Sequence, residues 1–411
     1  MRFSFRRAAT MGVALVSVAG ITACGSSDSG GESSKTTTAA AAKTTKPIVI
    51  AAPINLTGWM ADSDVPVLTG MKMAISDYNA KGGILGRKIE LKVEDQKSDV
   101  GQGAKLALSL APGADVMITP SDFDMGAPAA LVAQSKGLLN ISPSAASAKF
   151  GDLKSIGDLA FSDGSTVNGA AAAIAEWAHD EKGYRSAYML QDNSIVYTTG
   201  LCHGFEDRWK AYTDSKLVGV DTFKNADTSF SSQVQKLKAI KPAPEVIYMC
   251  SYPPGGPSVI RQLRAAGIET PILLPDSFDT TGWTKAVPHA SNLYFATYAS
   301  IHGDDPDESV NANVKKYEEV VGKPPTRSHF LVGYATIQLY AAAVEAAGTT
   351  DSQKVKSAME QFKDQKSVIQ PTTFTPTSHI ANRAATIIQM QDGKASFAAR
   401  KAATKVPAYR P

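Results

Sequence analysis

The sequence lacks the features that mark several protein classes. No stretch of its 411 residues reaches the roughly 18 consecutive apolar residues that span a bilayer, which excludes an integral membrane protein. Three cysteines are too few for a disulfide-scaffolded mini-protein. The 42 Lys and Arg nearly balance the 39 Asp and Glu, and a net charge of +3 argues against a nucleic-acid partner. With 43% hydrophobic and 20% charged residues, the composition is that of a folded protein long enough for two domains.

Catalytic and cofactor-binding motifs are also missing. The chain has no Gly-x-x-x-x-Gly-Lys, Gly-x-Gly-x-x-Gly, His-Glu-x-x-His, Gly-x-Ser-x-Gly, Ser-x-x-Lys or Cys-x-x-Cys. Its six histidines have no metal-ligand spacing. We therefore expect a protein without a metal ion or cofactor that is not an enzyme. The alternative is an extracytoplasmic enzyme whose acids and bases assemble from distant residues.

The first 23 residues are typical of a signal peptide. Arg2, Arg6 and Arg7 precede a short apolar stretch at residues 11–21, which is too short to span a membrane. It ends in Ile21-Thr22-Ala23-Cys24, which resembles a bacterial lipobox, where the cysteine is lipidated after cleavage. The prediction is an extracytoplasmic protein anchored to the cell membrane through Cys24. An ordinary secretory leader with an incidental cysteine is the alternative.

Residues 24–46 predict a flexible tether. After Cys24 this segment contains no large apolar side chain, so burial cannot offset the entropy of ordering it. Random-coil arithmetic gives it a reach of about 25 Å. A folded body on such a tether can meet a partner in the membrane.

From residue 47 onward, apolar strand patterns alternate with helical patterns. Strands are expected at residues 48–52, 88–93, 115–119, 138–142, 185–190, 216–220, 245–250, 272–274, 293–297 and 384–390. Helices are expected at residues 65–80, 103–110, 127–135, 200–212, 230–240, 258–266 and 328–347, the last so apolar that it should be buried. This alternation predicts an α/β fold with two doubly wound parallel sheets. Ligands bind at the carboxyl ends of such strands, and these ends are mostly polar, small or aromatic here.

Two cysteines remain beyond Cys24. Cys202 lies at the start of the helix after strand 185–190, and Cys250 ends strand 245–250. In a sheet of order 2-1-3-4-5 these strands are neighbours, so a Cys202–Cys250 disulfide is expected. Two buried free thiols are the alternative.

A set of short motifs, in order along residues 47–395, resembles the branched-chain amino-acid binding proteins of ABC importers, which have the type I periplasmic-binding fold. The matching stretches are Leu56-Thr57-Gly58, Tyr78-Asn79-Ala80-Lys81-Gly82-Gly83-Ile84, Leu139-Asn140-Ile141-Ser142-Pro143-Ser144-Ala145, Tyr197-Thr198-Thr199-Gly200, Asp227-Thr228-Ser229-Phe230 and Arg261-Gln262-Leu263-Arg264-Ala265-Ala266-Gly267.

The resemblance implies two lobes joined by three crossing segments, with a ligand held in the cleft between them. Lobe one would comprise residues 47–163 and 299–370, and lobe two residues 164–298 and 371–411. The crossings would fall near Asp163, Thr297 and Pro371. The lobes would close around the ligand by a hinge motion.

The resemblance also implies where a ligand carboxylate binds. The loop at Ser144, Ala145 and Ala146 would offer N–H groups to it. The family's hydroxyl at Ala146 is missing, so another serine of this loop would replace it. The helix start at Ser165 and Thr166 would offer a further N–H group, since helix N-termini favour anions.

The opposite wall of the implied site would bind the rest of the ligand. Tyr197 and Tyr252 would wall the cleft, although both also suit ordinary packing. Asp276 would bind the ligand's ammonium, at closer range or through water because the family has the longer Glu. Alternatively, Asp276 caps a helix beginning at Thr280 or pairs with an arginine.

One loop departs from the family pattern. The family's Ser-rich loop reads Ser121-Asp122-Phe123-Asp124 here, so that Phe123 replaces a ligand-binding serine. Asp122 and Asp124 are either solvated loop acids or contacts for a second amine on the ligand. Trp59 would add an aromatic face to the cleft or cover lobe one. Such a cleft could favour an aromatic or larger ligand.

The expected function is capture of an amino acid-like solute and its delivery to an ABC permease, by a monomer. Two alternatives stay open at this point. One is a binding protein for a short amide, urea or an aromatic acid, and the other is a ligand-sensing ectodomain.

Overall fold

The computed structural model describes residues 46–410, so the predicted signal peptide, Cys24 and nearly all of the tether lie outside the described residues. The strands are β1 (Ile48–Ile54), β2 (Ile89–Asp95), β3 (Val116–Ile118), β4 (Asn140–Ser142), β5 (Ala160–Ser165), β6 (Ser186–Asp192), β7 (Lys216–Phe223), β8 (Val246–Cys250), β9 (Ile272–Leu274), β10 (Leu293–Thr297), β11 (Ile380–Ala381), β12 (Ala385–Gln391) and β13 (Lys394–Lys401). The helices are α1 (Ala61–Ala80), α2 (Val100–Leu110), α3 (Phe123–Ser135), α4 (Val167–Glu176), α5 (Val196–Lys210), α6 (Ser231–Ala239), α7 (Gly255–Ala265), α8 (Glu308–Val321), α9 (His329–Ala347) and α10 (Ser352–Met359), with short turns η1 (Trp177–Glu181), η2 (Asp276–Phe278) and η3 (Thr284–Ala286).

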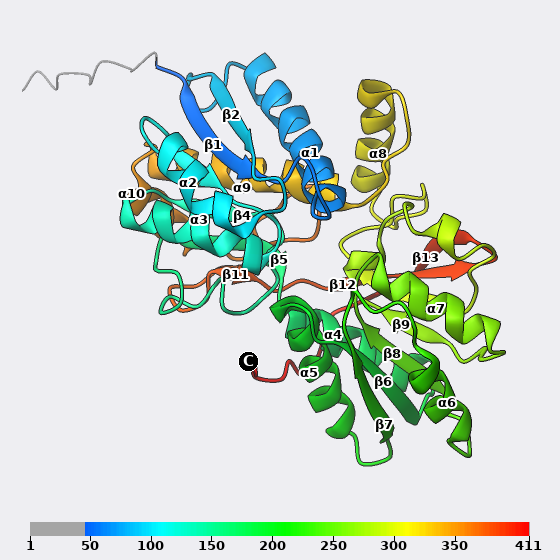
Figure 1. The fold of residues 1–411 in the computed structure, drawn as a ribbon. Helices are drawn as coiled ribbons and strands as arrows, with labels where there is room; N and C mark the ends of the chain where they lie inside the picture. Colours follow the sequence, from blue (N-terminus) through cyan, green and yellow to red (C-terminus); the bar gives the residue numbers. More distant parts are fainter. Residues whose placement is uncertain (1–45, 411) are drawn as a thin grey trace, which may run out of the picture. The chain divides into compact units, whose positions relative to one another are not determined.

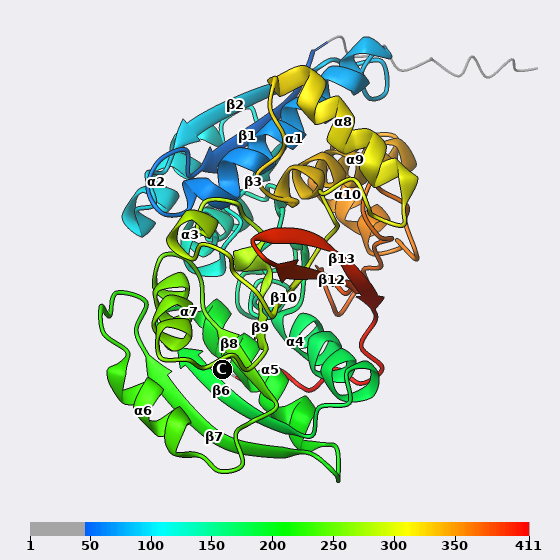
Figure 2. The same ribbon diagram turned by 90° about the vertical axis from the view of Figure 1, so that its right-hand side faces the viewer.

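The strands form two sheets, which confirms the predicted fold class. The first has the order β11-β5-β4-β3-β1-β2 and the second the order β13-β12-β10-β9-β8-β6-β7. In both, the first strand lies between the second and the third, and these pairs are parallel. This is the 2-1-3-4-5 order expected of a doubly wound sheet. The antiparallel pair β12–β13 extends the second sheet at its edge (Figure 2).

The chain passes between the two sheets three times. It leaves the first sheet after β5, returns after β10, and leaves again between β11 and β12. β11 pairs with β5 in the first sheet, although residues 371–411 were assigned to lobe two. The third passage therefore falls after Ala381 and not near Pro371. A two-residue strand is too short for its pattern to be recognised in sequence.

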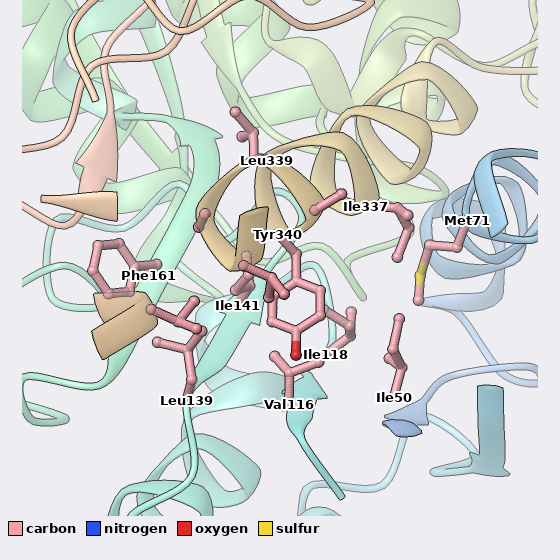
Figure 3. Close-up of a cluster of buried hydrophobic side chains, with 14 of the residues drawn as sticks. Ile50, Met71, Val116, Ile118, Leu139, Ile141, Phe161, Ile337, Leu339 and Tyr340 are labelled. Atoms are coloured by element: carbon pink, nitrogen blue, oxygen red, sulfur yellow. The ribbon is translucent and has the colours of Figure 1, made fainter. Parts of the chain in front are cut away.

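Helices cover both faces of the first sheet (Figure 1). Alternate strand residues point to opposite faces, so Ile50 packs with α1, α9 and α10, whereas Ala51 and Met117 pack with α2 and α3. Figure 3 shows Tyr340 of α9 among strand residues such as Ile118. In the described part of the chain, α9 alone has the length and composition of a membrane span, but it is 67% buried inside the protein. Its burial confirms the expectation for residues 328–347.

Helices α1 and α9 pack closely because a glycine of each faces the other backbone. A Cβ atom on Gly70 would lie 1.7 Å from the Phe330 carbonyl oxygen, and one on Gly333 would lie 2.0 Å from the Val67 carbonyl oxygen. Both contacts are shorter than real Cβ atoms tolerate. The helices could accommodate a side chain only by separating.

We therefore expect Gly333→Ala to lower the free energy of unfolding by about 1–3 kcal/mol, the usual cost of overpacking. Helix propensity alone predicts that the variant is more stable, since Ala favours the helix interior over Gly by up to about 1 kcal/mol. Urea denaturation of the variant would measure the difference. An increase in stability would contradict the close approach of α1 and α9.

The second sheet is likewise covered on both faces. Ala187 and Tyr248 pack with α4 and α5, whereas Tyr188 and Ile247 pack with α6 and α7. The predicted disulfide is present and joins Cys202 of α5 to Cys250 of β8, with Cα atoms 5.6 Å apart. It links two adjacent layers of this lobe.

Five helices begin three or four residues earlier than the sequence predicted. They are α1, α2, α3, α5 and α7, which begin at Ala61, Val100, Phe123, Val196 and Gly255. Pro66, Pro128 and Pro257 lie inside three of them and look like helix breakers in sequence. Pro257 is the third residue of α7 and costs little, because an N–H group at that position has no intrahelical acceptor. Pro66 and Pro128 are the sixth residues of α1 and α3, so each removes one intrahelical hydrogen bond. The earlier starts carry loop residues such as Tyr197 onto helices.

Candidate functional site

A cavity of about 390 Å³ lies where the carboxyl ends of both sheets meet. This is where open parallel sheets bind ligands, and the volume is typical of small-molecule sites. The lining residues are Trp59, Met60, Asp62, Ser63, Ser121, Asp122, Phe123, Ser144, Ala146, Ser147, Ile195, Tyr197, Tyr252, Pro253, Pro254, Pro257, Asp276, Ser277, Thr280, Gly282, Trp283, Ala286, Arg327 and His329. Nine of the twelve predicted ligand-binding residues are among them.

Asp122 and its neighbours form the wall that follows β3. Asp122 is 8% exposed and caps α3, with Oδ1 accepting from the N–H groups of Asp124 and Met125. Burial raises its pKa to about 7, with a further contribution from the charge of Asp124. Asp122 is therefore not the solvated loop acid of one alternative, because its carboxylate belongs to the helix cap and the cavity wall.

Hydrogen-bond donors without protein partners line the same wall. Ser121 Oγ is buried and has no hydrogen-bond partner among residues 46–410. Within that range the backbone N–H groups of Ser144 and Ala146 also have no acceptor. The N–H of Ala145 instead donates to Ser142 Oγ at 3.1 Å, and Ala145 is fully buried outside the cavity. The prediction of Ala145 as a ligand contact is corrected accordingly.

The start of α4 does not reach the main cavity. Thr166 caps α4 by accepting from the N–H of Gly169, and the N–H of Val167 donates to the Ala146 carbonyl at 2.9 Å. The N–H groups of Gly169 and Val167 are therefore already paired within the protein, and neither Ser165 nor Thr166 lines the main cavity. Ser165 lines a neighbouring chamber of about 20 Å³, which has room for one water. The predicted anion contacts at Ser165 and Thr166 are corrected on this ground.

Asp276, directly after β9, is the acid of the opposite wall. The Tyr197 hydroxyl donates to its Oδ1, and its Oδ2 lies 3.6 Å from His329 Nε2 and 4.0 Å from Arg327 Nη2. Burial raises the pKa of Asp276, while the charge of Arg327 opposes that rise. The pairing with an arginine, left open from sequence, is thus present.

Arg327 and His329 are site residues that the sequence did not reveal. Arg327 is 5% exposed and donates to His329 Nδ1, Ser63 Oγ and the Asp276 carbonyl at 2.9, 2.8 and 3.0 Å. Burial, together with the charge of Arg327, lowers the pKa of His329 well below its usual value, so its ring is neutral. Both residues sit at the start of α9, and the apolar pattern of that helix gave no indication that its first turn faces the cavity.

Aromatic rings form the apolar part of the cavity. The rings of Trp59 and Tyr252 lie 5.4 Å apart between their centroids, and Trp59 is 41% exposed at the rim. Trp59 therefore contacts lobe two rather than only covering lobe one. Tyr197 stands on α5 and Tyr252 follows β8, the two elements that the disulfide joins.

The two lobes contact each other across the cavity. The N–H of Val196 on α5 donates to Asp124 Oδ2 at 3.2 Å, and Thr280 Oγ1 donates to Asp62 Oδ1 at 3.1 Å. These bonds hold the walls together at separate points of the rim. The two walls of the cavity are thus joined directly at these two points.

Acidic, histidine and cysteine side chains do not gather into a metal-binding cluster anywhere in residues 46–410. The polar groups of the cavity instead include two carboxylates beside one guanidinium, unpaired N–H groups and a free hydroxyl. Such an arrangement can bind an amphiphilic molecule that carries both a negative and a positive group.

Comparison with known proteins shows several relatives of similar length. The periplasmic binding protein family matches residues 47–395. The Leu/Ile/Val-binding protein BraC3 of Rhizobium johnstonii is 24% identical over 350 residues, covering 84% of this chain and 92% of that protein. The Leucine-, isoleucine-, valine-, threonine-, and alanine-binding protein of Pseudomonas aeruginosa is 24% identical over 323 residues, covering 76% of this chain and 81% of that protein.

Solved structures share the fold at low sequence identity. The branched-chain amino acid transporter substrate binding protein LivJ of Streptococcus pneumoniae, solved with isoleucine, is 22% identical, with a TM-score of 0.75 over 87% of this chain and 99% of that one. An ABC transporter solute binding protein of R. palustris, solved with benzoate, is 18% identical, with a TM-score of 0.74 over 88% of this chain and 98% of that one. Proteins of this fold therefore accept ligands with and without an amine.

Proposed function

The chain belongs to the periplasmic binding protein family and has its type I fold, and we propose that its cleft captures a small amino acid-like solute and releases it unaltered. The ligand carboxylate binds the N–H groups of Ser144 and Ala146 and the hydroxyl of Ser121. The ligand ammonium binds Asp276. Tyr197, Tyr252 and Trp59 enclose the remainder.

One observation carries this proposal. The partly buried carboxylate of Asp276 lines the same cavity as the N–H groups of Ser144 and Ala146, which have no acceptor among residues 46–410. Unpaired N–H groups at a cavity wall cost free energy, and a zwitterion supplies an acceptor to them and a cation to the Asp276 carboxylate. Charge-assisted hydrogen bonds in a water-poor cleft are stronger than those made in water.

Delivery to an ABC permease completes the proposed function. Cys24, lipidated, holds the protein at the outer side of the cell membrane, and residues 24–46 let the closed body reach the permease. Closure joins the rims at Val196–Asp124 and Thr280–Asp62, which creates a continuous surface that the open form lacks. In this proposal the protein acts as a monomer. It binds the solute and transfers it to the permease without changing it chemically.

The test pairs each amino acid with the acid that lacks its amine, for example norvaline with pentanoate. We expect amino acids to raise the melting temperature of the tether-free protein, and tighter ligands to raise it further, since a ligand that binds only the folded state stabilises it by mass action. Stabilisation by the deaminated acids and by no amino acid would overturn the ammonium contact.

Asp276→Asn should weaken amino acid binding by about 10- to 100-fold, the equivalent of about 1.5–3 kcal/mol for a hydrogen bond to a charged group. Binding of the deaminated partner acid should stay nearly unchanged, because it makes no contact that needs the negative charge. Isothermal titration calorimetry measures both ligands on both proteins. Equal losses for the two ligands would show that Asp276 only shapes the cleft.

An aromatic carboxylic acid is the second candidate ligand, and one observation favours it. Asp276 already accepts from Tyr197 and lies near Arg327, so its charge is partly balanced without a ligand. Phe123 and Trp283 add to an aromatic lining that suits a ring. In that case benzoate-like acids bind and Asp276→Asn leaves their affinity unchanged.

A further inference from the structure

The charges around the cavity are unevenly balanced. Three lining carboxylates, Asp62, Asp122 and Asp276, accompany one lining cation in the described structure, Arg327. Arg327 Nη1 lies 3.6 Å from Asp62 and Nη2 lies 4.0 Å from Asp276. Asp122 forms no salt bridge with any residue in 46–410, although it is 8% exposed. A zwitterionic amino acid bound at Asp276 would leave Asp122 without a counter-charge.

One oxygen of Asp122 is free for a ligand. Both backbone donors of the α3 cap bind Oδ1, and Oδ2 accepts no hydrogen bond from residues 46–410. Beside it, Ser121 Oγ is buried without a partner and also lines the cavity. A neighbouring buried acid, Asp64, is by contrast fully used, because its oxygens accept from the backbone N–H groups of Ser121 and Asn55 and from the Asn55 side chain.

Aromatic residues line the same cavity as Asp122. Tyr252 and Trp59 are two of them, and their ring centroids lie 5.4 Å apart. Phe123 is adjacent in sequence and lines the cavity. Aromatic faces next to a carboxylate favour a cationic group, because the ring quadrupole and the charge act in the same direction.

The two acids stand on opposite walls of the cavity. Asp276 begins η2 after β9 and accepts from Tyr197, whereas Asp122 lies between β3 and α3 and caps α3. A ligand held by its α-ammonium at Asp276 can therefore present a second group to Asp122.

We propose that Asp122, with Trp59 and Tyr252, forms a second subsite that binds a terminal ammonium or guanidinium, so that the ligands are amino acids with a cationic side chain. This inference rests on the proposed amino acid ligand and narrows its class. The Asp122 carboxylate is buried without a cationic partner among residues 46–410, which costs free energy. A cationic group on the ligand would pair with this carboxylate and remove that cost.

The subsite implies a dependence on pH. The titratable groups facing Asp122 are Asp124 of α3, Asp64 of α1 and Tyr252 after β8, and none of them is cationic near neutral pH. With its pKa raised to about 7, Asp122 is protonated in much of the unliganded protein below that pH and charged above it. The preference for a cationic over a neutral side chain should thus rise between pH 6 and pH 8.

The test compares lysine with norleucine, which has the same chain length and no side-chain amine. We expect the protein to bind lysine at least tenfold more tightly than norleucine by calorimetry at pH 8. Asp122→Asn should abolish this preference and its rise with pH. Asn caps helices as well as Asp does, so the variant keeps α3 intact. Asp99→Asn is the matched control, since Asp99 caps α2 in the same way, accepting from Gly101, and lies outside the cavity.

The outcomes separate the two proposals. Norleucine binding as tightly as lysine overturns the cationic subsite and leaves the amino acid ligand intact. Failure of both amino acids to bind overturns the proposed ligand together with the subsite. A lysine preference that survives Asp122→Asn also overturns the assignment, because the amine then binds elsewhere.

Discussion

Replacing Arg383 with methionine is expected to lower the free energy of unfolding by about 3–5 kcal/mol, the usual cost of removing one partner of a buried ion pair. Arg383 lies between β11 and β12, and Asp163 lies in β5. Both side chains are completely buried. The guanidinium donates to the Asp163 carboxylate and carbonyl, to Thr372 Oγ1 and to the Gln370 carbonyl. Without it, the Asp163 carboxylate stays buried without its counter-charge.

This ion pair joins segments where the chain passes between the sheets. Asp163 belongs to the first passage and Arg383 to the third. Hydrogen bonds also link the second passage to the residues before and after the third. The Tyr298 carbonyl accepts from Gln370 Nε2 at 2.9 Å and from Thr386 Oγ1 at 3.2 Å. We therefore expect Arg383→Met also to loosen the hinge, which would appear as weaker ligand binding.

Two controls make the Arg383 result specific. Adding Asp163→Asn to Arg383→Met should recover part of the lost stability, because the unpaired charge is removed as well. Arg410→Met removes an arginine from exposed pairs with Glu206 and Asp207 and should change stability by less than about 1 kcal/mol. Guanidinium denaturation measures all three. A loss for Arg383→Met as small as that for Arg410→Met would contradict the prediction.

Removal of the disulfide by the double change Cys202→Ala and Cys250→Ala should destabilise the protein by about 4 kcal/mol. The bond joins residues 48 positions apart. Loop-closure entropy for a loop of that length predicts about 4 kcal/mol, through restriction of the unfolded chain. Both sulfurs are buried in the α4–α5 core, so solvent does not replace their contacts. Alanine avoids introducing a buried hydroxyl.

The measurement is denaturation with and without a strong thiol reductant. Reductant should lower the midpoint for the unmodified protein and leave the midpoint of the double variant unchanged. Cys24→Ala is the matched control, because it removes a cysteine that takes no part in the Cys202–Cys250 bond. A double variant as stable as the oxidised protein would show that the bond contributes nothing to folding. Because Tyr197 and Tyr252 stand on the joined elements, ligand affinity is a second readout.

Much of the fold followed from local patterns in the sequence. The runs at residues 48–52 and 245–250 became β1 and β8, and the apolar stretch at 328–347 became the buried helix α9. Strand order predicted the Cys202–Cys250 bond, because the carboxyl ends of adjacent parallel strands share one edge. These features depend on the hydrophobic period within each segment and on the order of the segments along the chain, and both can be read directly from the sequence.

The sequence predicted only part of the candidate site. Strand ends identified Ser121, Tyr252 and Asp276 as candidates, and all three line the cavity. Ala145 and Thr166 were misplaced, because which N–H groups stay unpaired depends on how the loop and α4 dock.

The sequence by itself determined most strands and helices, their order in the sheets and the loops that can reach a ligand, because these follow from side-chain period and turn residues along short stretches. It did not reveal β5, β11 or β13. Only the tertiary structure decided that Arg327 stands beside Ser63, 264 positions away, and that Asp122 lacks a cation while Asp276 has one nearby. The net charge of a cavity depends on residues that come from distant segments of the chain. A local sequence pattern therefore cannot predict it.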